Sequence, residues 1–243
     1  MKICVLENDV LDSQVAPIYR RYGDMFARLF QAAGAHWEMD MFHTPQGEYP
    51  AHFADYDAVL LTGSRADAFS QAPWVATLRE QVTQLLAQNK KLVGICFGHQ
   101  LIAACLGAPI GRASQGWGAG RMCYQWHAPE LAPGRREIAL LASHQDQVFA
   151  LPAGATLLAS SAFCPIAAFR LGQNVICVQA HPEFVEDYSA YLLHKRRALL
   201  GEAQFQASIE SLQLGHDGVA MARIIADFVA SQASQAQPAS RAA

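Results

Sequence analysis

The feature that most restricts the fold of this chain is a regular alternation of short apolar runs with helical patterns through its first half. The strand-length runs cover residues 2–6, 37–41, 57–61 and 91–95. The stretches with apolar residues at helical spacing cover residues 18–33, 74–88 and 98–106. Strands that alternate with helices pair in parallel and carry the helices on their faces. This alternation of strands and helices therefore predicts a doubly wound, mostly parallel α/β sheet with helices on both faces.

The middle of the chain, at about residues 109–172, has a different character. Glycines and prolines break it into short strand-like pieces, which predicts a small antiparallel insertion at one side of the sheet. Residues 174–179 return to a buried strand, and three helices are expected after it. Their approximate ranges are 184–199, 203–213 and 217–231, with Asp217 as the N-cap of the last helix.

Residues 1–230 are expected to form a single domain, and residues 231–243 a disordered tail of low complexity without apolar anchors. Hydrophobic residues make up 52% of the 243 residues and charged residues only 16%, which supports a substantial buried core. Six cysteines occur without a Cys-x-x-Cys pair, and the N-terminus reaches Glu7 after four apolar residues, unlike a signal peptide. We therefore expect a protein of the reducing cytoplasm.

Composition also restricts the partners. The formal net charge of −3 gives no electrostatic footprint for DNA, RNA or an anionic membrane, and no apolar run approaches the roughly 20 residues that span a bilayer. The sequence holds no G-x-x-x-x-G-K-[ST] loop for ATP. The Cys-x-x-His formed by Cys96 and His99 lacks the second pair of ligands that zinc requires. We expect a small-molecule substrate, no cofactor and no metal.

Residues 94–98, Gly-Ile-Cys-Phe-Gly, have the form G-x-C-x-G between a predicted strand and a predicted helix. This is a cysteine version of the nucleophile elbow, a sharp turn that holds a nucleophile at the top of the sheet. The glycines remove side chains that would collide at the turn, and the helix N-terminus stabilises a thiolate. Cys96 is therefore a candidate nucleophile, with a buried cysteine in a tight turn as the alternative.

A cysteine nucleophile needs a base, and the base needs an orienting group. Among nine histidines, His181 alone follows a predicted buried strand and has a carboxylate, Glu183, two residues later. Residues i and i+2 of an extended segment project to the same side, so the two side chains can meet. Pro182 favours an extended conformation at His181. The alternative is an incidental surface histidine at a turn that ends the strand.

Taken together, Gly-Ile-Cys-Phe-Gly-His-Gln at 94–100 and His-Pro-Glu at 181–183 resemble the signature of class I glutamine amidotransferases. The resemblance covers the chain from its first strand to about residue 185 and implies a flavodoxin-like fold. It implies that Cys96, His181 and Glu183 form a catalytic triad that removes the γ-amide of glutamine through a glutamyl thioester. It also implies that Gln100 contacts the glutamyl part of the substrate, with a capping or packing role as the alternative.

An acyl transfer of this kind also needs two backbone N–H groups aimed at the oxyanion. The elbow supplies one of them from Phe97. By the resemblance, the other comes from Gly63, in the Leu-Thr-Gly-Ser loop that follows an earlier strand. The family often has proline two residues after this glycine, whereas this chain has Arg65, which leaves the shape of the loop open.

Two other segments resemble particular members of this family. Ser-His-Gln-Asp-Gln-Val at 143–148 resembles a segment of GMP synthase amidotransferase domains, and Gly-Trp-Gly at 116–118 is similar to stand-alone relatives, which include γ-glutamyl peptidases. His144 is interpreted as a histidine that braces the site, and His99 as structural. Trp117 is interpreted as a packing residue, with the acceptor side of the site as its alternative place.

Three functions follow as hypotheses. The first is a free-standing cysteine hydrolase or transferase for glutamine or a γ-glutamyl compound. The second is a glutaminase subunit that is active only with a separate synthase partner. The third is a catalytically silent binding module on the same fold, against which the intact set of Cys96, His181 and Glu183 argues.

Overall fold

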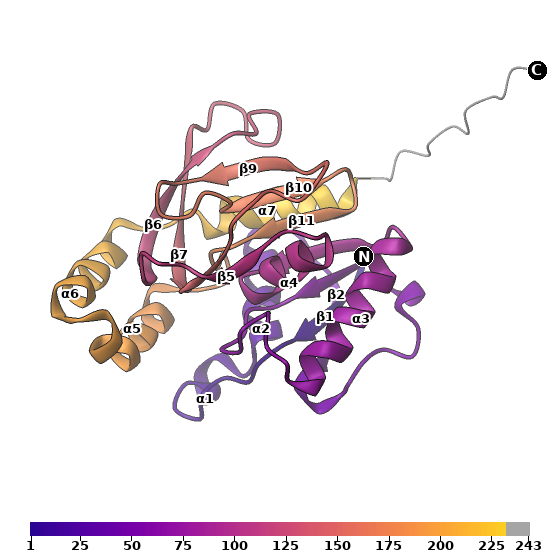
Figure 1. Ribbon diagram of the computed structural model, residues 1–243, viewed down its shortest axis with the longest axis horizontal. Helices are drawn as coiled ribbons and strands as arrows, with labels where there is room; N and C mark the ends of the chain where they lie inside the picture. Colours follow the sequence, from indigo (N-terminus) through magenta and orange to yellow (C-terminus); the bar gives the residue numbers. More distant parts are fainter. Residues whose placement is uncertain (232–243) are drawn as a thin grey trace, which may run out of the picture.

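A sheet of nine strands runs through the part of the chain that the computed structural model describes, residues 1–231 (Figure 1). Its strand order is β2-β1-β3-β4-β11-β10-β9-β6-β7, and a separate two-stranded sheet pairs β5 with β8. The strands are β1 (Lys2–Glu7), β2 (Glu38–His43), β3 (Ala58–Leu61), β4 (Lys91–Ile95), β5 (Ile110–Arg112), β6 (Gly118–Trp126), β7 (Glu137–His144), β8 (Asp146–Val148), β9 (Thr156–Ser160), β10 (Ala168–Leu171) and β11 (Val175–Val178). The α-helices are α1 (Ala16–Tyr19), α2 (Tyr22–Ala32), α3 (Pro73–Ala87), α4 (Phe97–Cys105), α5 (Glu186–Leu200), α6 (Glu202–Ser211) and α7 (Gly218–Ala230). The short 3-10 helices are η1 (Thr44–Gln46), η2 (Phe53–Asp55) and η3 (Leu212–Leu214).

Five neighbouring strands, β2, β1, β3, β4 and β11, run parallel. Buried side chains occupy nearly every position of β1, β3, β4 and β11, because helices cover both faces of the sheet. Ile3 and Val5 pack in one core with residues of α2 and α7, whereas Cys4 and Leu6 pack in the other with residues of α3 and α4. The predicted doubly wound α/β sheet with helices on both faces is therefore confirmed.

The remaining strands form the predicted antiparallel insertion. Strands β10, β9, β6 and β7 pair antiparallel and continue the main sheet beyond β11. Strands β5 and β8 form a small antiparallel sheet of their own. Helices α5 and α6 lie against β6 and β7, on the left of Figure 1. Strand β11 returns beside β4, so the residues that follow these two parallel strands lie at the same edge of the sheet.

Two details of the predicted helices differ. The helix expected at 18–33 is divided into α1 and α2, because Arg20 adopts a positive φ of 66° that turns the chain. Asp217 is the N-cap residue of α7, as predicted, although its side chain makes no capping hydrogen bond. Its carboxylate instead accepts a hydrogen bond of 2.8 Å from the amide of Ala139 in β7 and pairs with Arg135 at 2.9 Å.

The predicted tail, residues 231–243, lies outside the described residues except for Ser231. The single domain predicted over residues 1–230 stays a prediction. Within residues 1–231, the helices are too short or too polar to cross a bilayer.

Close packing of α4 on the sheet predicts that Gly98→Ala destabilises the fold. A Cβ at Gly98 would lie 2.5 Å from the carbonyl oxygen of Leu61 and 2.7 Å from its Cβ, and these atoms belong to β3. We expect the free energy of unfolding to fall by about 1–3 kcal/mol, as measured by urea denaturation and circular dichroism. Helix propensity alone predicts a gain of roughly 0.5–1 kcal/mol for the same change. An unchanged or raised denaturation midpoint would therefore contradict the close contact.

Candidate active site

Cys96 forms the sharp turn between β4 and α4. Its amide donates to the carbonyl of Val178 in β11 at 2.9 Å, so the pairing of the two parallel strands continues up to the turn. Cys96 adopts φ 52° and ψ −101°, a conformation that residues with a side chain rarely adopt. Its carbonyl then accepts from the amide of Gln100 at 3.0 Å. The elbow predicted at 94–98 is confirmed.

The glycines on either side of Cys96 let the helix approach the sheet. A Cβ at Gly94 would lie 2.8 Å from the carbonyl oxygen of Gly98 and 2.8 Å from the Cδ1 of Ile102. At Gly98, the obstacle is Leu61 in β3. The collisions expected from the sequence at these two positions are therefore present.

His181 and Glu183 lie in the segment that follows β11. The amide of His181 donates to the carbonyl of Leu141 in β7 at 2.8 Å, which fixes the segment against the antiparallel half of the sheet. The imidazole donates from Nδ1 to Glu183 Oε1 at 2.7 Å and stacks on the ring of Phe184, with centroids 3.8 Å apart. Both His181 and Glu183 are buried. The structure thus brings together the pair that the i, i+2 spacing predicts.

Cys96 and His181 meet where β4 and β11 end. The thiol of Cys96 interacts with the imidazole of His181, whose Nδ1 is engaged by Glu183. Burial disfavours the charged imidazole, but the charges of Glu183 and Cys96 outweigh it and raise the pKa of His181 to about 10. The site therefore favours an imidazolium between the carboxylate of Glu183 and the sulfur of Cys96.

Gly63 lies in the loop after β3, directly against this pair. A Cβ at Gly63 would lie 2.7 Å from His181 Cε1 and 3.6 Å from Cys96 Cβ, so a side chain here would displace the imidazole. Phe97 is the first residue of α4, and an amide at that position has no acceptor within its own helix. Gly63 and Phe97 therefore both adjoin Cys96, and their role at an oxyanion stays a prediction.

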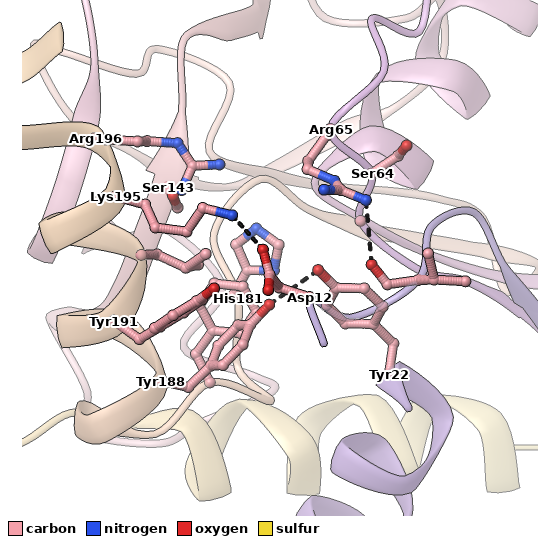
Figure 2. A pocket seen from close by; sticks show the side chains of 14 residues that line it. Asp12, Tyr22, Ser64, Arg65, Ser143, His181, Tyr188, Tyr191, Lys195 and Arg196 are labelled. Carbon is pink, nitrogen blue, oxygen red and sulfur yellow. Dashed lines mark hydrogen bonds and ion pairs between the residues drawn. The ribbon is translucent and has the colours of Figure 1, made fainter. Parts of the chain in front are cut away.

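Two adjoining cavities lie beside Cys96 and His181. The larger, of about 250 Å³, is lined by Cys96 and Gln100, and we call it the cysteine-side cavity. The smaller, of about 40 Å³, is lined by His181, and we call it the histidine-side cavity (Figure 2). The residues that line both cavities are Ser64, Arg65, Ser143 and Arg196.

Gln100 lines the cysteine-side cavity, but its amide nitrogen is already engaged. It donates to the carbonyl of Asp146 at 2.9 Å and to the side-chain oxygen of Gln179 at 3.1 Å. Gln179 in turn places its Nε2 at 3.7 Å from Cys96 Sγ. The Gln100 nitrogen therefore braces the wall of the site, and a contact between Gln100 and substrate stays a prediction.

Arg65 and Trp117 take part in the structure of the site as well. The backbone amide and the guanidinium of Arg65 donate to the carboxylate of Asp9 at 2.8 Å, which joins the loop after β3 to the loop after β1. Trp117 is partly buried in the core near α5 and also lines the cysteine-side cavity. Trp117 therefore packs in the core and also faces the site, and its place on the acceptor side stays a prediction.

His144 and His99 are both buried, and burial lowers the pKa of His144 to about 4 and the pKa of His99 to about 3. The Nδ1 of His144 lies 3.1 Å from the carbonyl oxygen of Asp146, at the end of β7. The ring of His99 packs against that of Phe169, with centroids 5.2 Å apart. Both histidines are therefore neutral at pH 7, which agrees with the structural roles predicted for them.

Reasoning from the sequence missed three residues of the site: Gln179, Phe184 and Arg196. Gln179 is a buried polar residue two positions before His181, so the period-two alternation of a strand is a signal that could have found it. Phe184 and Arg196 carry no such signal, because their places depend on how the segment after β11 packs. Among residues 1–231, no group of three or more His, Cys, Asp or Glu side chains is arranged to hold a metal ion.

Comparisons with known proteins agree with this geometry. The family model for glutamine amidotransferase class-I matches residues 17–195. Gamma-glutamyl peptidase 3 of Arabidopsis thaliana is 36% identical over 180 residues, which cover 70% of this chain and 72% of that protein. A subunit of the glutamine-hydrolyzing GMP synthase of Archaeoglobus fulgidus is 40% identical over 94 residues, 38% of this chain and 51% of that protein.

The fold is also similar to that of solved structures. The crystal structure of a glutamine amidotransferase from Thermotoga maritima superposes with a TM-score of 0.76 at 19% identity, over 95% of this chain and 99% of that one. Because the family model spans most of the chain and a relative above 30% identity covers more than two thirds of it, the family is established. This chain belongs to the class I glutamine amidotransferase family.

Proposed function

We propose that this chain is a cysteine hydrolase or amidotransferase that acts on the γ-amide of glutamine or of a γ-glutamyl compound. Cys96 is the nucleophile, His181 the acid and base, and Glu183 the group that orients the imidazole. The N–H groups of Gly63 and Phe97 bind the oxyanion. The single observation that carries the proposal is the series of contacts from Glu183 through His181 to Cys96 at the wall of a cavity.

The reaction divides into two acyl transfers. The sulfur of Cys96 attacks the γ-carbonyl carbon, the bond from that carbon to nitrogen breaks, and the leaving amine takes a proton from His181. Water then attacks the same carbon of the glutamyl thioester while it gives a proton to His181, and the bond from that carbon to the sulfur of Cys96 breaks. Glutamate leaves, and the pair of Cys96 and His181 again holds one proton between its two side chains. In both steps negative charge gathers on the carbonyl oxygen, where the N–H groups of Gly63 and Phe97 stabilise it.

A free-standing enzyme is the better supported of the two enzyme hypotheses. Over 180 residues this chain is 36% identical to gamma-glutamyl peptidase 3 but 27% identical to the GMP synthase of Aeropyrum pernix. A glutaminase subunit with a synthase partner is the second candidate, and a small molecule is the substrate in both. The six free cysteines, four of them buried, favour the reducing cytoplasm for either enzyme.

Mass-spectrometric trapping of an acyl group on Cys96 tests the proposal. Protein mixed with glutamine or with a γ-glutamyl dipeptide and quenched in acid is expected to carry a glutamyl group, which peptide mapping places on Cys96. Cys96→Ala is expected to carry none, because the sulfur that forms the thioester is gone. Cys123→Ala removes an exposed free cysteine and is the matched control, which keeps the adduct.

The outcomes separate the three hypotheses. Glutamate release by the chain alone, with an adduct on Cys96, supports the free-standing enzyme. Weak release that rises when a synthase is added, together with a stable complex, supports the glutaminase subunit, because ammonia must then be delivered rather than lost. A folded protein that forms no adduct and releases no glutamate under either condition would leave only the silent binding module.

A further inference from the structure

Four lysine and arginine side chains line the two cavities, and three of them are paired with carboxylates. Arg65 binds Asp9, and Lys195 binds Asp12. In the cysteine-side cavity, Arg112 binds both Asp67 and Asp146. The fourth, Arg196, has no carboxylate partner in the part of the chain that the structure describes. The groups that act most on its charge are the phenols of Tyr22 and Tyr188, the thiol of Cys96 and the guanidinium of Arg65.

Arg196 is nevertheless held in a defined place. It projects from α5, and its guanidinium lies over the ring of Trp117, 5.0 Å from the ring centroid. Figure 2 shows Arg196 and Lys195 extending together from α5 into the pocket that contains His181. Burial lowers the pKa of Arg196 below its ordinary value, so the site holds a partly desolvated guanidinium that no carboxylate among residues 1–231 pairs with. A guanidinium stacked on an aromatic ring keeps its edge free for two parallel hydrogen bonds to a carboxylate.

The proposed mechanism determines which part of a substrate faces this guanidinium. His181 gives its proton to the leaving amine, so the amine lies on the histidine side of Cys96. The glutamyl chain then extends into the cysteine-side cavity, where Gln100 lies. Whatever is attached to the amine nitrogen enters the histidine-side cavity, which Arg196 also lines. Ammonia, the leaving group of glutamine, has no further atoms to place there.

We propose that Arg196 is a specificity-determining residue that binds a free carboxylate on the leaving amine. The preferred substrates are γ-glutamyl amino acids or peptides with a free C-terminal carboxylate, rather than glutamine. This inference rests on the proposed function. Two charge-assisted hydrogen bonds to the carboxylate are expected to raise kcat/KM by about tenfold to a hundredfold.

The test compares γ-glutamylglycine with γ-glutamylglycinamide, whose leaving groups end in a carboxylate and in a neutral carboxamide of similar size. The wild-type chain is expected to favour γ-glutamylglycine by about tenfold to a hundredfold in kcat/KM, mainly through a lower KM. Arg196→Met is expected to bring the ratio of kcat/KM for the two substrates close to one, and Arg196→Lys to restore part of the preference. The matched control is Arg197→Met, which removes the neighbouring exposed arginine paired with Glu202 and keeps the preference.

Other results would overturn the assignment. If Arg196→Met loses activity equally on both substrates, Arg196 acts through its packing on Trp117 or on the glutamyl α-carboxylate, which both substrates share. A wild-type chain that cleaves both substrates equally well also overturns it, while the proposed function stands. If the wild-type chain cleaves neither substrate and the neutral donor γ-glutamyl-p-nitroanilide also leaves no acyl group on Cys96, the proposed function fails, and this inference fails with it.

Discussion

Replacement of His181 by alanine is expected to lower kcat by on the order of 10⁴- to 10⁶-fold. The change removes the acid that protonates the leaving amine and the imidazolium that stabilises the sulfur of Cys96. It also leaves the buried carboxylate of Glu183 without its partner. The measurement is the initial rate of glutamate release from saturating γ-glutamylglycine, with circular dichroism to confirm the fold.

The matched control for this variant is His52→Ala. His52 is exposed and lies outside both cavities, so its removal is expected to leave kcat unchanged. General acid and base catalysis contributes about 10²- to 10⁴-fold by itself. A folded His181→Ala protein that keeps a rate within about tenfold of the wild type would therefore exclude His181 as the acid and base.

Substitution Glu183→Gln is expected to lower kcat by roughly 10⁴-fold without unfolding the chain. Glutamine keeps the shape of glutamate but no longer stabilises the imidazolium. Burial, which disfavours the charged imidazole, is then no longer outweighed by a carboxylate, and the pKa of His181 falls below its wild-type value of about 10. The alkaline limb of the profile of kcat/KM against pH is therefore expected to move to lower pH. A merely structural defect would lower the whole profile without moving this limb.

The same substitution is expected to change how stability depends on pH. The pKa of His181 in the folded chain, about 10, lies above its ordinary value of 6.5. The charged imidazole therefore stabilises the fold in full below pH 6.5, and this contribution is lost as the pH rises through about 10. The difference in the free energy of unfolding between the wild type and Glu183→Gln should thus be largest below pH 6.5 and shrink toward pH 10. A constant difference would show that Glu183 does not act on the charge of His181.

Much of the architecture could be predicted because helix and strand periodicity are local properties of a sequence. The run at 91–95 coincides with β4, and that at 57–61 differs from β3 by one residue at its start. The helix expected at 18–33 is divided at Arg20, whose positive φ the apolar spacing does not reveal. Asp217 is the N-cap residue predicted for α7, but its carboxylate binds the amide of Ala139 in β7, a contact between distant segments.

The candidate site could be predicted in part for the same reason. The nucleophile elbow around Cys96 and the pair of His181 and Glu183 are short patterns whose geometry depends on a few neighbouring residues. Their approach to one another follows from the parallel pairing of β4 with β11, which places the ends of both strands at one edge of the sheet. Their catalytic roles are the predictions that acyl trapping and the variants above examine.

Local patterns were thus enough to indicate the α/β sheet, the elbow and the residues that surround it. The packing of the elements was needed to learn that the Gln100 nitrogen is bound by Asp146 and Gln179, and that Arg196 lies beside His181 with no carboxylate partner among residues 1–231. Periodicity records only which side of its own element a residue faces. Whether a charge finds a partner depends on which other elements pack against that side, and here α5 carries its arginine to the end of two strands that precede it in the chain.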